Sequence, residues 1–501
     1  MHTALLLDMI ADAAPDRLAL GRRAEGLTFA EMRRRAHHGA AWLEALGGRN
    51  VAFLGLNGPT LPIAVFAAGM LARPFAPLNY RLPDADLRKL VARTAPAVAI
   101  VDDDMVPRLG TCEGVTIVSR TAFEAACRVH GDCDAEFLDV DHDIAVLLFT
   151  SGTTGEPKAA ILRHANLTSY VISTVEFLGS EDDEAALVSV PPYHIAGISA
   201  VLTGVYSGRR IVHLEAFTPE AWVDMAAAEG ITHAMVVPTM LGRILDVLEA
   251  RGESLPQLKA LSYGGGRMPL PVIERALKIL PHVGFANAYG LTETSSTISV
   301  LGPEDHWMAI HSDDPAARQR LGSVGRPLPS LEVEIRDPYG QVVPRGEAGE
   351  IYVRGEQVSG EYAHKKVTDA DGWFATNDGG WMDADGYLYV EGRLDDVIVR
   401  GGENISPGEI EDVLREHPGV ADVAVLGVHD DQWGEAVAAA VVPRGPAPSH
   451  EELAQWVKAR LRSTKTPEVW DFREALPYND TGKLLRRQLK AELNARAKAA
   501  S

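Results

Sequence analysis

The stretch Ile144-Ala-Val-Leu-Leu-Phe149 runs directly into Thr150-Ser-Gly-Thr-Thr-Gly-Glu-Pro-Lys158. Its first half is a short apolar run, which predicts a buried strand. In its second half, glycines let backbone N–H groups approach an anion, hydroxyls add donors, and the lysine adds a positive charge. The Gly-x4-Gly-Lys-[Ser/Thr] spacing of the P-loop is absent. The stretch therefore predicts either a phosphate-binding loop of another type or a flexible polar turn.

The chain around this stretch alternates short apolar runs with helix-length segments through about residue 300. Buried runs that alternate with helices predict parallel sheets covered by helices on both faces. The other expected strands are Val51–Leu56, Ala97–Val101, Ala186–Val190, Ile211–Leu214, Ala234–Val237 and Ala260–Tyr263. The expected helices include Phe29–Leu46 and Ala221–Glu229, and the apolar run Ile63–Ala72 is expected to form a buried helix.

The pattern changes twice in the last third of the chain. From about residue 321 to 392, short strand-like runs alternate with Asp-Gly and Tyr-Gly turns, which predicts a small β-barrel subdomain. After Arg393, two amphipathic helices surround two strands, which predicts a compact α+β unit. The expected organisation is an N-terminal domain over 1–392, a hinge over 393–396 and a mobile C-terminal domain over 397–501.

Composition restricts the possible functions. Among 501 residues, 48 Lys+Arg and 69 Asp+Glu give a net charge of −21, which argues against general nucleic-acid or anionic-membrane binding. The chain exceeds the roughly 250–300 residues that one core supports. Three cysteines without a CxxC pair favour a reducing cytoplasm and no structural zinc. The longest apolar run is about half of the ~20 residues that a membrane span needs.

Further motifs follow the phosphate loop in a fixed order. They are Pro191-Pro-Tyr-His194, Tyr289-Gly-Leu-Thr-Glu293, Gly372-Trp-Phe-Ala-Thr-Asn-Asp378, Gly392-Arg-Leu-Asp-Asp396 and Asn479-Asp-Thr-Gly-Lys483. With these motifs the chain resembles the adenylate-forming superfamily of acyl- and aryl-CoA synthetases, peptide-synthetase adenylation domains and beetle luciferases. The resemblance covers about residues 5 to 490.

The resemblance implies a reaction in two halves. A carboxylate attacks the α-phosphate of ATP and gives an acyl-adenylate and pyrophosphate; a thiol, normally of CoA, then forms a thioester and releases AMP. Such chemistry asks the protein mainly for positioning and charge neutralisation. The implied cofactors are ATP, Mg²⁺ and CoA.

The resemblance also assigns nucleotide contacts. Glu293 would bind Mg²⁺ with help from Thr150, Tyr289 would lie against the adenine, Asp378 would accept both ribose hydroxyls, and Arg393 would donate to ribose or phosphate. The remaining predicted ATP contacts are Ser151, Gly152, Thr153, Thr154, Gly155, Lys158, Gly264, Gly265, Gly266, Ala288, Gly290 and Thr292. The alternatives are a first-turn acid for Glu293, a core aromatic for Tyr289 and a plain turn acid for Asp378.

The C-terminal motifs imply moving parts. Lys483 would reach the α-phosphate and carboxylate during adenylation, Asp395 would be the hinge, and a second orientation would bring Gly401 and Gly402 to the pantetheine arm of CoA. The alternative interpretations are a solvated tail lysine for Lys483 and a tight hairpin turn for Gly401 and Gly402.

The acid pocket is predicted more weakly. His194 would line the pocket and gate carboxylate entry, although a satisfied core histidine is the alternative. The other candidates are Tyr193, Val236, Tyr263, Gly264, Ala288 and Ser296. Apolar or small residues in these segments suggest a hydrophobic acid: aryl, fatty, alicyclic or terpenoid.

Three functions therefore remain open on the sequence. The residues Gly401–Pro407, followed by Glu409-Ile-Glu411, resemble the CoA-ligase version of the family, which favours a CoA ligase. A stand-alone adenylating enzyme that serves a carrier protein or partner enzyme is the second, and a non-catalytic nucleotide-binding regulator is the third. A homodimer is left open.

The chain departs from the family pattern at two positions. Ala159 replaces a glycine after the loop lysine, and Asn377 replaces the glycine of Thr-Gly-Asp. Because Asn tolerates left-handed backbone better than most residues, we expect the second turn to survive.

Overall fold

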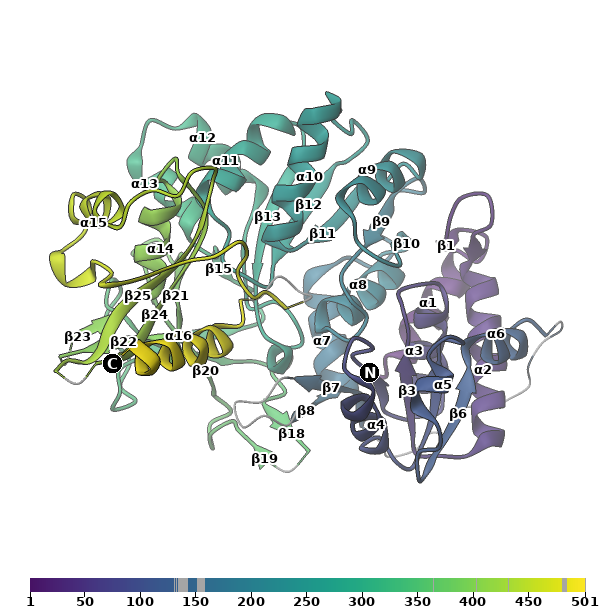
Figure 1. Ribbon diagram of the computed structural model, residues 1–501. Coiled ribbons are helices and arrows are strands. Elements are labelled where there is room, and N and C mark those ends of the chain that lie inside the picture. Colours follow the sequence, from purple (N-terminus) through teal and green to yellow (C-terminus); the bar gives the residue numbers. More distant parts are fainter. Residues whose placement is uncertain are drawn as a thin grey trace.

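The computed structural model describes residues 1–129, 131, 133, 143–150, 158–363, 365–401, 403–430, 432–479 and 484–500. Across these residues the chain builds two large sheets, a smaller antiparallel sheet and a C-terminal sheet, all with helices between or around them (Figure 1). Parallel pairing dominates both large sheets, which confirms the α/β fold class.

The strand that precedes the phosphate loop lies inside the first large sheet. Among the described residues this sheet has the order β19-β18-β8-β7-β4-β3-β5-β6. Its strands are β3 (Asn50–Leu54), β4 (Phe75–Pro77), β5 (Ala97–Val101), β6 (Val115–Ser119), β7 (Ile144–Thr150), β8 (Lys158–Arg163), β18 (Glu361–Tyr362) and β19 (Lys365–Lys366). Antiparallel pairing of β7 with β8 places Thr150 opposite Lys158, so both ends of the loop meet at one point.

The second large sheet carries the remaining strands of the N-terminal part. Its order over the described residues is β15-β14-β13-β12-β11-β9-β10-β1-β2. The strands are β1 (Leu18–Leu20), β2 (Leu27–Thr28), β9 (Ala185–Val188), β10 (Arg210–His213), β11 (His233–Val236), β12 (Ala260–Gly264), β13 (Gly284–Tyr289), β14 (Ser299–Leu301) and β15 (Arg326–Pro327). The run from β1 to β13 is parallel, so the loops after β9–β13 meet at one edge.

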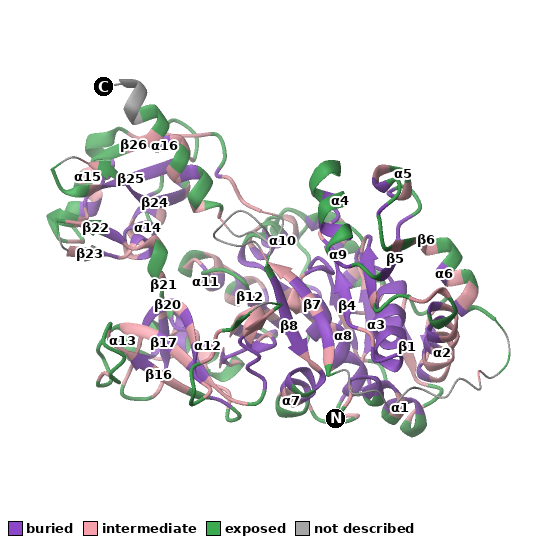
Figure 2. Cartoon of the chain, turned by 90° about the horizontal axis from the view of Figure 1, so that it is seen from below, coloured by how far each residue is buried: buried purple, intermediate pink, exposed green. Residues whose placement is uncertain are grey.

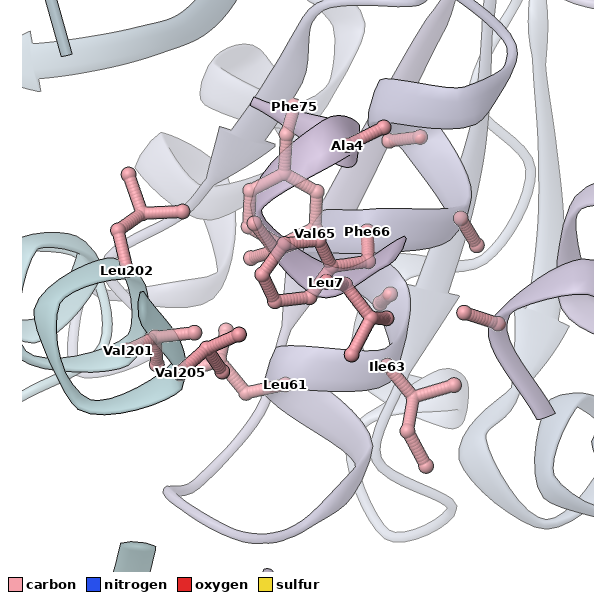
Figure 3. Close-up of a cluster of buried hydrophobic side chains, with 14 of the residues drawn as sticks. Ala4, Leu7, Leu61, Ile63, Val65, Phe66, Phe75, Val201, Leu202 and Val205 are labelled. Atoms are coloured by element: carbon pink, nitrogen blue, oxygen red, sulfur yellow. The ribbon is translucent and has the colours of Figure 1, made fainter. Parts of the chain in front are cut away.

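Helices cover these sheets. They are α1 (Ala4–Ala13), α2 (Phe29–Leu46), α3 (Thr60–Met70), α4 (Asp84–Ala92), α5 (Val106–Leu109), α6 (Arg120–Cys127), α7 (His164–Thr174), α8 (Ile195–Tyr206), α9 (Pro219–Ala228), α10 (Pro238–Arg251), α11 (Leu270–Ile279), α12 (Pro303–His311) and α13 (Pro315–Gln319). Every residue of α3 is buried, as its apolar sequence predicts. Figure 3 shows Leu61 and Phe66 of α3 close to Val201 and Val205 of α8, which join the two sheet layers in one core.

The β-rich segment forms an antiparallel sheet in the order β16-β17-β20-β21. Its strands are β16 (Glu332–Arg336), β17 (Gly349–Arg354), β20 (Phe374–Met382) and β21 (Leu388–Arg393). The other short strands of this segment, β15, β18 and β19, extend the two large sheets. The segment is therefore attached to both large sheets by hydrogen bonds.

The C-terminal part is a mixed sheet with helices on its faces. It contains β22 (Ile398–Arg400), β23 (Glu403–Ile405), β24 (Val420–Asp430), β25 (Gly434–Pro443), β26 (Val469–Phe472), α14 (Pro407–Arg415), α15 (His450–Lys458) and α16 (Arg486–Ala500). In Figure 2, β21 leads from the β-rich sheet towards α14 and the other C-terminal elements. In the described part of the chain, no helix is both long and apolar enough to cross a membrane.

Candidate active site

The turn that leaves β13 is folded back on itself. A Cβ atom on Gly290 would lie 1.6 Å from the carbonyl oxygen of Ser296, so only glycine fits there. Ser295 and Ser296 have φ values of +57° and +123°, which are strained for residues with a side chain. The surrounding contacts that maintain this strain hold Thr292 and Glu293 in the short 3₁₀ turn η1 (Thr292–Thr294), which begins three residues after Tyr289.

A buried glutamine fixes this turn. The Nε2 atom of Gln357 donates to the carbonyl oxygens of Thr294 at 3.0 Å and Thr297 at 2.7 Å. The backbone carbonyl of Gln357 accepts a hydrogen bond of 2.8 Å from the Ser295 hydroxyl. Gln357 is fully buried. It is therefore a positioning residue, which sequence reasoning missed because it belongs to none of the recognised motifs.

A glycine-rich loop lies beside this turn. In the pairing of β12 with β13, Gly264 is opposite Ala288, and a Cβ on Gly264 would lie 2.3 Å from the Ala288 carbonyl oxygen. Gly265 follows with φ +77°, and Gly265 and Gly266 are exposed. Exposed backbone without side chains is what a flat base needs for close approach.

A carboxylate joins this region to the β-rich sheet. The Tyr289 hydroxyl donates to Asp378 Oδ2 at 2.6 Å, and Arg393 Nε lies 3.0 Å from Asp378 Oδ1. Burial, followed by the charge of Asp378, raises the pKa of Tyr289, so the hydroxyl keeps its proton and remains a donor. A carboxylate offers about four lone-pair positions, so these two donors need not exclude a ribose hydroxyl.

A second set of residues joins Glu293 to the strand after the phosphate loop. The Tyr362 hydroxyl donates to Glu293 Oε1, and the Lys158 ammonium lies 6.0 Å from the centroid of the Tyr362 ring. Burial and then the Glu293 charge raise the pKa of Tyr362. The Thr150 hydroxyl donates to the Lys158 carbonyl at 3.4 Å. Glu293 and Lys158 thus lie against Tyr362, a residue that the sequence did not single out, and Thr150 is attached to Lys158.

These donors fit a magnesium ion that is bound chiefly through substrate. No group of three His, Cys, Asp or Glu side chains in the described part of the chain could hold a metal. Mg²⁺ commonly takes one or two carboxylates together with phosphate oxygens and water. The Glu293 carboxylate and Thr150 hydroxyl would supply hard oxygen ligands of this kind, and the ion would neutralise phosphate charge.

A cavity of about 350 Å³ opens next to the site. It lies beyond the carboxyl ends of strands from both large sheets, where ligands of α/β proteins commonly bind. Its walls include Asn57, Tyr80, Arg81, Ser189, Pro191, Glu215, Thr239, Met240 and Arg243, together with Tyr478 and Asn479 from the C-terminal part. The cavity therefore lies between the two parts of the chain.

The predicted acid-pocket residues divide between two faces of the sheet. Val236 and Tyr263 are fully buried in the layer of α9, α10 and α11, and the Tyr263 hydroxyl pairs with His306 Nε2 at 2.8 Å. This geometry does not support the Tyr263 or Val236 side chain as a pocket wall. Ala288 and Ser296 are half-buried on or after β13.

The start of α8 agrees better with a pocket. His194 is the half-buried N-cap residue of α8, and its ring lies 4.7 Å from that of Tyr193. Tyr193 is buried and meets Tyr80 edge-on at 5.6 Å between ring centroids. Since Tyr80 lines the cavity, this aromatic group connects α8 to it.

The predicted C-terminal site residues also lie in different places. Asp395 lies in η3 (Leu394–Asp396), between β21 and β22, and accepts a hydrogen bond from Asn377. Gly401, with φ +55°, lies in the β22–β23 hairpin, where its N–H donates to the Trp433 carbonyl at 2.8 Å. It is not among the cavity walls. The predicted contacts Ser151, Gly152, Thr153, Thr154, Gly155, Gly402 and Lys483 lie outside the described residues.

Comparisons with known proteins decide the family. A family model described as AMP-binding enzyme matches residues 7–363, and one described as AMP-binding enzyme C-terminal domain matches residues 409–483. The chain belongs to the AMP-binding enzyme family. This confirms the resemblance to adenylate-forming enzymes.

Several relatives within the family are CoA ligases or synthetases, and one is a fatty acid–[acyl-carrier-protein] ligase from Streptomyces coeruleorubidus, 31% identical over 93% of this chain and 91% of the relative. A feruloyl-CoA synthase from Amycolatopsis sp is 33% identical over 490 residues, 96% of each chain. A 2-succinylbenzoate–CoA ligase from Bacillus licheniformis is 34% identical over 489 residues, 96% of this chain and 98% of the relative. The structure of o-succinylbenzoate CoA synthetase from Bacillus subtilis with its acyl-adenylate superimposes with a TM-score of 0.84 at 30% identity, covering 97% of each chain. The same synthetase has been solved with ATP and magnesium ion.

The chain is therefore an ATP-dependent, AMP-forming acyl- or aryl-CoA ligase that works through an acyl-adenylate and uses ATP, Mg²⁺ and CoA. Its acceptor chemistry is that of a CoA ligase, and a carrier protein as partner stays a prediction, as do the homodimer and a cytoplasmic location.

The Gln357 clamp gives a testable prediction. Replacement Gln357→Leu keeps the volume but leaves the buried Thr294 and Thr297 carbonyls unpaired, which costs about 1–3 kcal/mol of unfolding free energy for each group. We expect a lower urea midpoint and a higher KM for ATP, because the turn carrying Glu293 loosens.

The matched control is Ser330→Ala, which removes only the hydroxyl that donates to Gln357 Oε1 at 3.3 Å. This variant should change the urea midpoint and the KM for ATP much less. Unchanged stability and an unchanged KM for ATP in Gln357→Leu would contradict the positioning role.

Proposed function

We propose that this ligase activates a hydrophobic acid with an aromatic ring. The acid would lie between α8 and the β11–β13 strands, and the nucleotide between the Gly264–Gly266 loop, Tyr289 and Asp378. The observation that carries the nucleotide position is the convergence of Tyr289, Asp378 and Arg393 near Glu293 and Tyr362, and the acid position rests on the Met235 side of β11.

Strand alternation supports the position of the acid. Successive side chains on a strand point to opposite faces of the sheet. The Met235 side chain therefore points away from that of the core residue Val236, and the Ala288 side chain points away from that of the buried Asn287. Met235 packs towards the core cluster that contains α8. Ala196 and Ile195 of α8 are also only partly buried there. A face of methionine and alanine side chains suits a flat, apolar ring.

The names of two of these relatives point to the same acid class, whereas a third relative is named for a fatty acid. Feruloyl-CoA synthase and 2-succinylbenzoate–CoA ligase both refer to acids that carry a benzene ring. The proposed acid is therefore an aryl acid, and fatty, alicyclic and terpenoid acids are the competing candidates.

The roles of the site residues follow from their positions. Asp378 would hold the ribose hydroxyls, and Arg393 would keep that carboxylate oriented and add charge near the phosphates. Lys158 and Thr150 would bind the terminal phosphates, while Glu293 would hold the magnesium ion, whose charge stabilises the leaving pyrophosphate. His194 would close the entrance through which the carboxylate reaches the α-phosphate.

The cavity suits the acceptor thiol. Arg81 and Arg243 lie among its walls, where their charge would favour the phosphates of CoA over a neutral thiol. Tyr478 pairs with Leu484 in an isolated bridge that brackets the Asn479–Lys483 motif, so the motif begins at the cavity wall. We propose that the C-terminal part turns about Asp395 between the half-reactions, bringing Gly401 in when Lys483 leaves.

A panel of carboxylic acids tests the function. Benzoic, cinnamic, fatty, alicyclic and terpenoid acids are each incubated with ATP and Mg²⁺, and pyrophosphate release is measured with and without CoA. We expect the aryl acids, benzoic and cinnamic, to give the highest kcat/KM and an acyl-CoA product. A higher ranking for the fatty, alicyclic or terpenoid acids would contradict the aryl assignment, and release that no acid stimulates would contradict the function itself.

Two neighbouring residues test the acid site. Met235→Ala should change the relative kcat/KM of large and small acids by about tenfold or more, because a pocket discriminates through such volume changes. Val236→Ala is the matched control and should cost about 2 kcal/mol of stability without reordering the acids. Reordering by Val236→Ala alone would show that the faces are assigned the wrong way round.

Lys483→Ala tests the division of labour between the half-reactions. We expect adenylate formation to fall about 10²–10³-fold, as when a charge aimed at the transition state is deleted. Thioester formation from supplied acyl-adenylate should change little. Equal loss in both half-reactions, measured in separate single-turnover experiments, would contradict this role.

A further inference from the structure

The residue that replaces the family glycine makes a contact that glycine cannot make. Asn377 lies in β20 with φ +59°, and its N–H donates to Glu350 Oε1 at 3.1 Å. Its side-chain Nδ2 donates to Asp395 Oδ2 at 2.9 Å. Asn377 is half-buried and Asp395 is exposed.

The contact lies where the N-terminal part ends. The β20–β21 ladder reaches Asp378 opposite Arg393, and Arg393 also donates to the Thr376 carbonyl at 2.8 Å. The bond from Asn377 to Asp395 extends this attachment to the turn η3, beyond the last strand pair. The linker that leads to β22 is therefore fastened to β20 at Thr376 and Asn377, directly before Asp378.

The backbone alone does not require asparagine at this position. Glycine adopts φ +59° without strain, whereas asparagine does so at some cost. The amide group therefore contributes something that the turn geometry does not need, and the contact it makes is the hydrogen bond to Asp395.

Other contacts hold the same orientation of the two parts. Arg267, next to the Gly264–Gly266 loop, pairs with Asp412 of α14, and the Ser406 hydroxyl donates to the Glu391 carbonyl at 3.2 Å. In this orientation Tyr478 and Asn479 line the cavity while Gly401 does not. We assign this orientation to the proposed adenylation step, because the Asn479 end of the C-terminal motif lies at the cavity wall.

We propose that Asn377 is a positioning residue that latches the hinge in the adenylation orientation and slows the rotation that precedes thioester formation. The inference rests on the proposed rotation about Asp395. A turn of the backbone at Asp395 moves its carboxylate away from β20, so the Asn377 bond breaks at each passage. The bond thereby sets the balance between the two half-reactions without touching either substrate.

Exchange of the two side-chain types tests the latch. Asn377→Asp places two carboxylates against each other and removes the donor, whereas the double variant Asn377→Asp with Asp395→Asn restores one amide donor and one carboxylate acceptor. Asn377→Gly is the third variant, because it removes the bond and suits the backbone. Each half-reaction is measured in single turnover, with the acid that ranks first in the panel, ATP and Mg²⁺, and with its acyl-adenylate and CoA.

The measured quantity is the rate constant of thioester formation divided by that of adenylate formation. We expect Asn377→Asp and Asn377→Gly to raise this ratio about three- to tenfold, the range of a partly exposed hydrogen bond to a charged group. The double variant should return within about twofold of the original ratio, which a merely structural effect at Asn377 would not do.

Two results overturn the latch, and they differ from failure of the proposed function. An unchanged ratio in Asn377→Gly and Asn377→Asp, with both half-reactions retained, shows that the bond does not control the rotation. A raised ratio that the double variant does not reverse shows that the Asn377–Asp395 pair is not the cause. If the unaltered protein itself forms no acyl-adenylate, the proposed function fails, and the latch fails with it.

Discussion

The pairing of the Asp378 carboxylate with Tyr289 and Arg393 is the interaction on which the site depends. It accepts from the Tyr289 hydroxyl and faces the Arg393 guanidinium, so it ties together the end of β13, the strand β20 and the last residue of β21. Asp378 is buried, and a buried charge is tolerated only when it is paired and hydrogen-bonded. Because these three residues come from two different sheets, the proposed nucleoside surface and the exit towards the C-terminal part form one structure.

The second large sheet separates core side chains from the proposed acid-site side chains by their direction. Val236 and Tyr263 point into the layer of α9–α11, while Met235 and Ala288 lie on strand positions of the other parity. The strained turn after β13, fixed by Gln357, then projects Glu293 towards Tyr362 and Lys158. Thus the ends of neighbouring strands, and not a single loop, bring the charged groups together.

Much of this arrangement could be predicted from the sequence. Apolar runs located Ala97–Val101 as β5 and Phe29–Leu46 as α2 with their observed bounds, since burial and the Thr28–Glu31 capping box are local signals. The φ of +59° at Asn377 confirms that this turn survives the loss of glycine. At the other departure, Ala159 lies in β8 opposite Phe149, where a strand needs no glycine.

The rest of the site could not be predicted from the sequence, because it depends on contacts between segments that are far apart in the chain. Gln357 and Tyr362 act on residues more than 60 positions earlier, and no local pattern announces such a pairing. Tyr263 was misplaced because a one-residue difference in strand phase exchanges the two faces of a sheet. The hydrogen bond from Asn377 to Asp395 could not be predicted either, because the sequence showed only that asparagine could adopt the turn.

The central claim is that Asp378 holds the ribose, and a combination of altered enzyme and altered nucleotide tests it most directly. The quantity is kcat/KM for adenylate formation with ATP and with 2′-deoxy-ATP and 3′-deoxy-ATP, in the unaltered protein and in Asp378→Asn. The account predicts that the unaltered protein prefers ATP and that Asp378→Asn loses most of this preference, because the nucleotide hydroxyls and the carboxylate act on each other. If Asp378→Asn weakens all three nucleotides by the same factor, the carboxylate does not contact the ribose, and the account is contradicted.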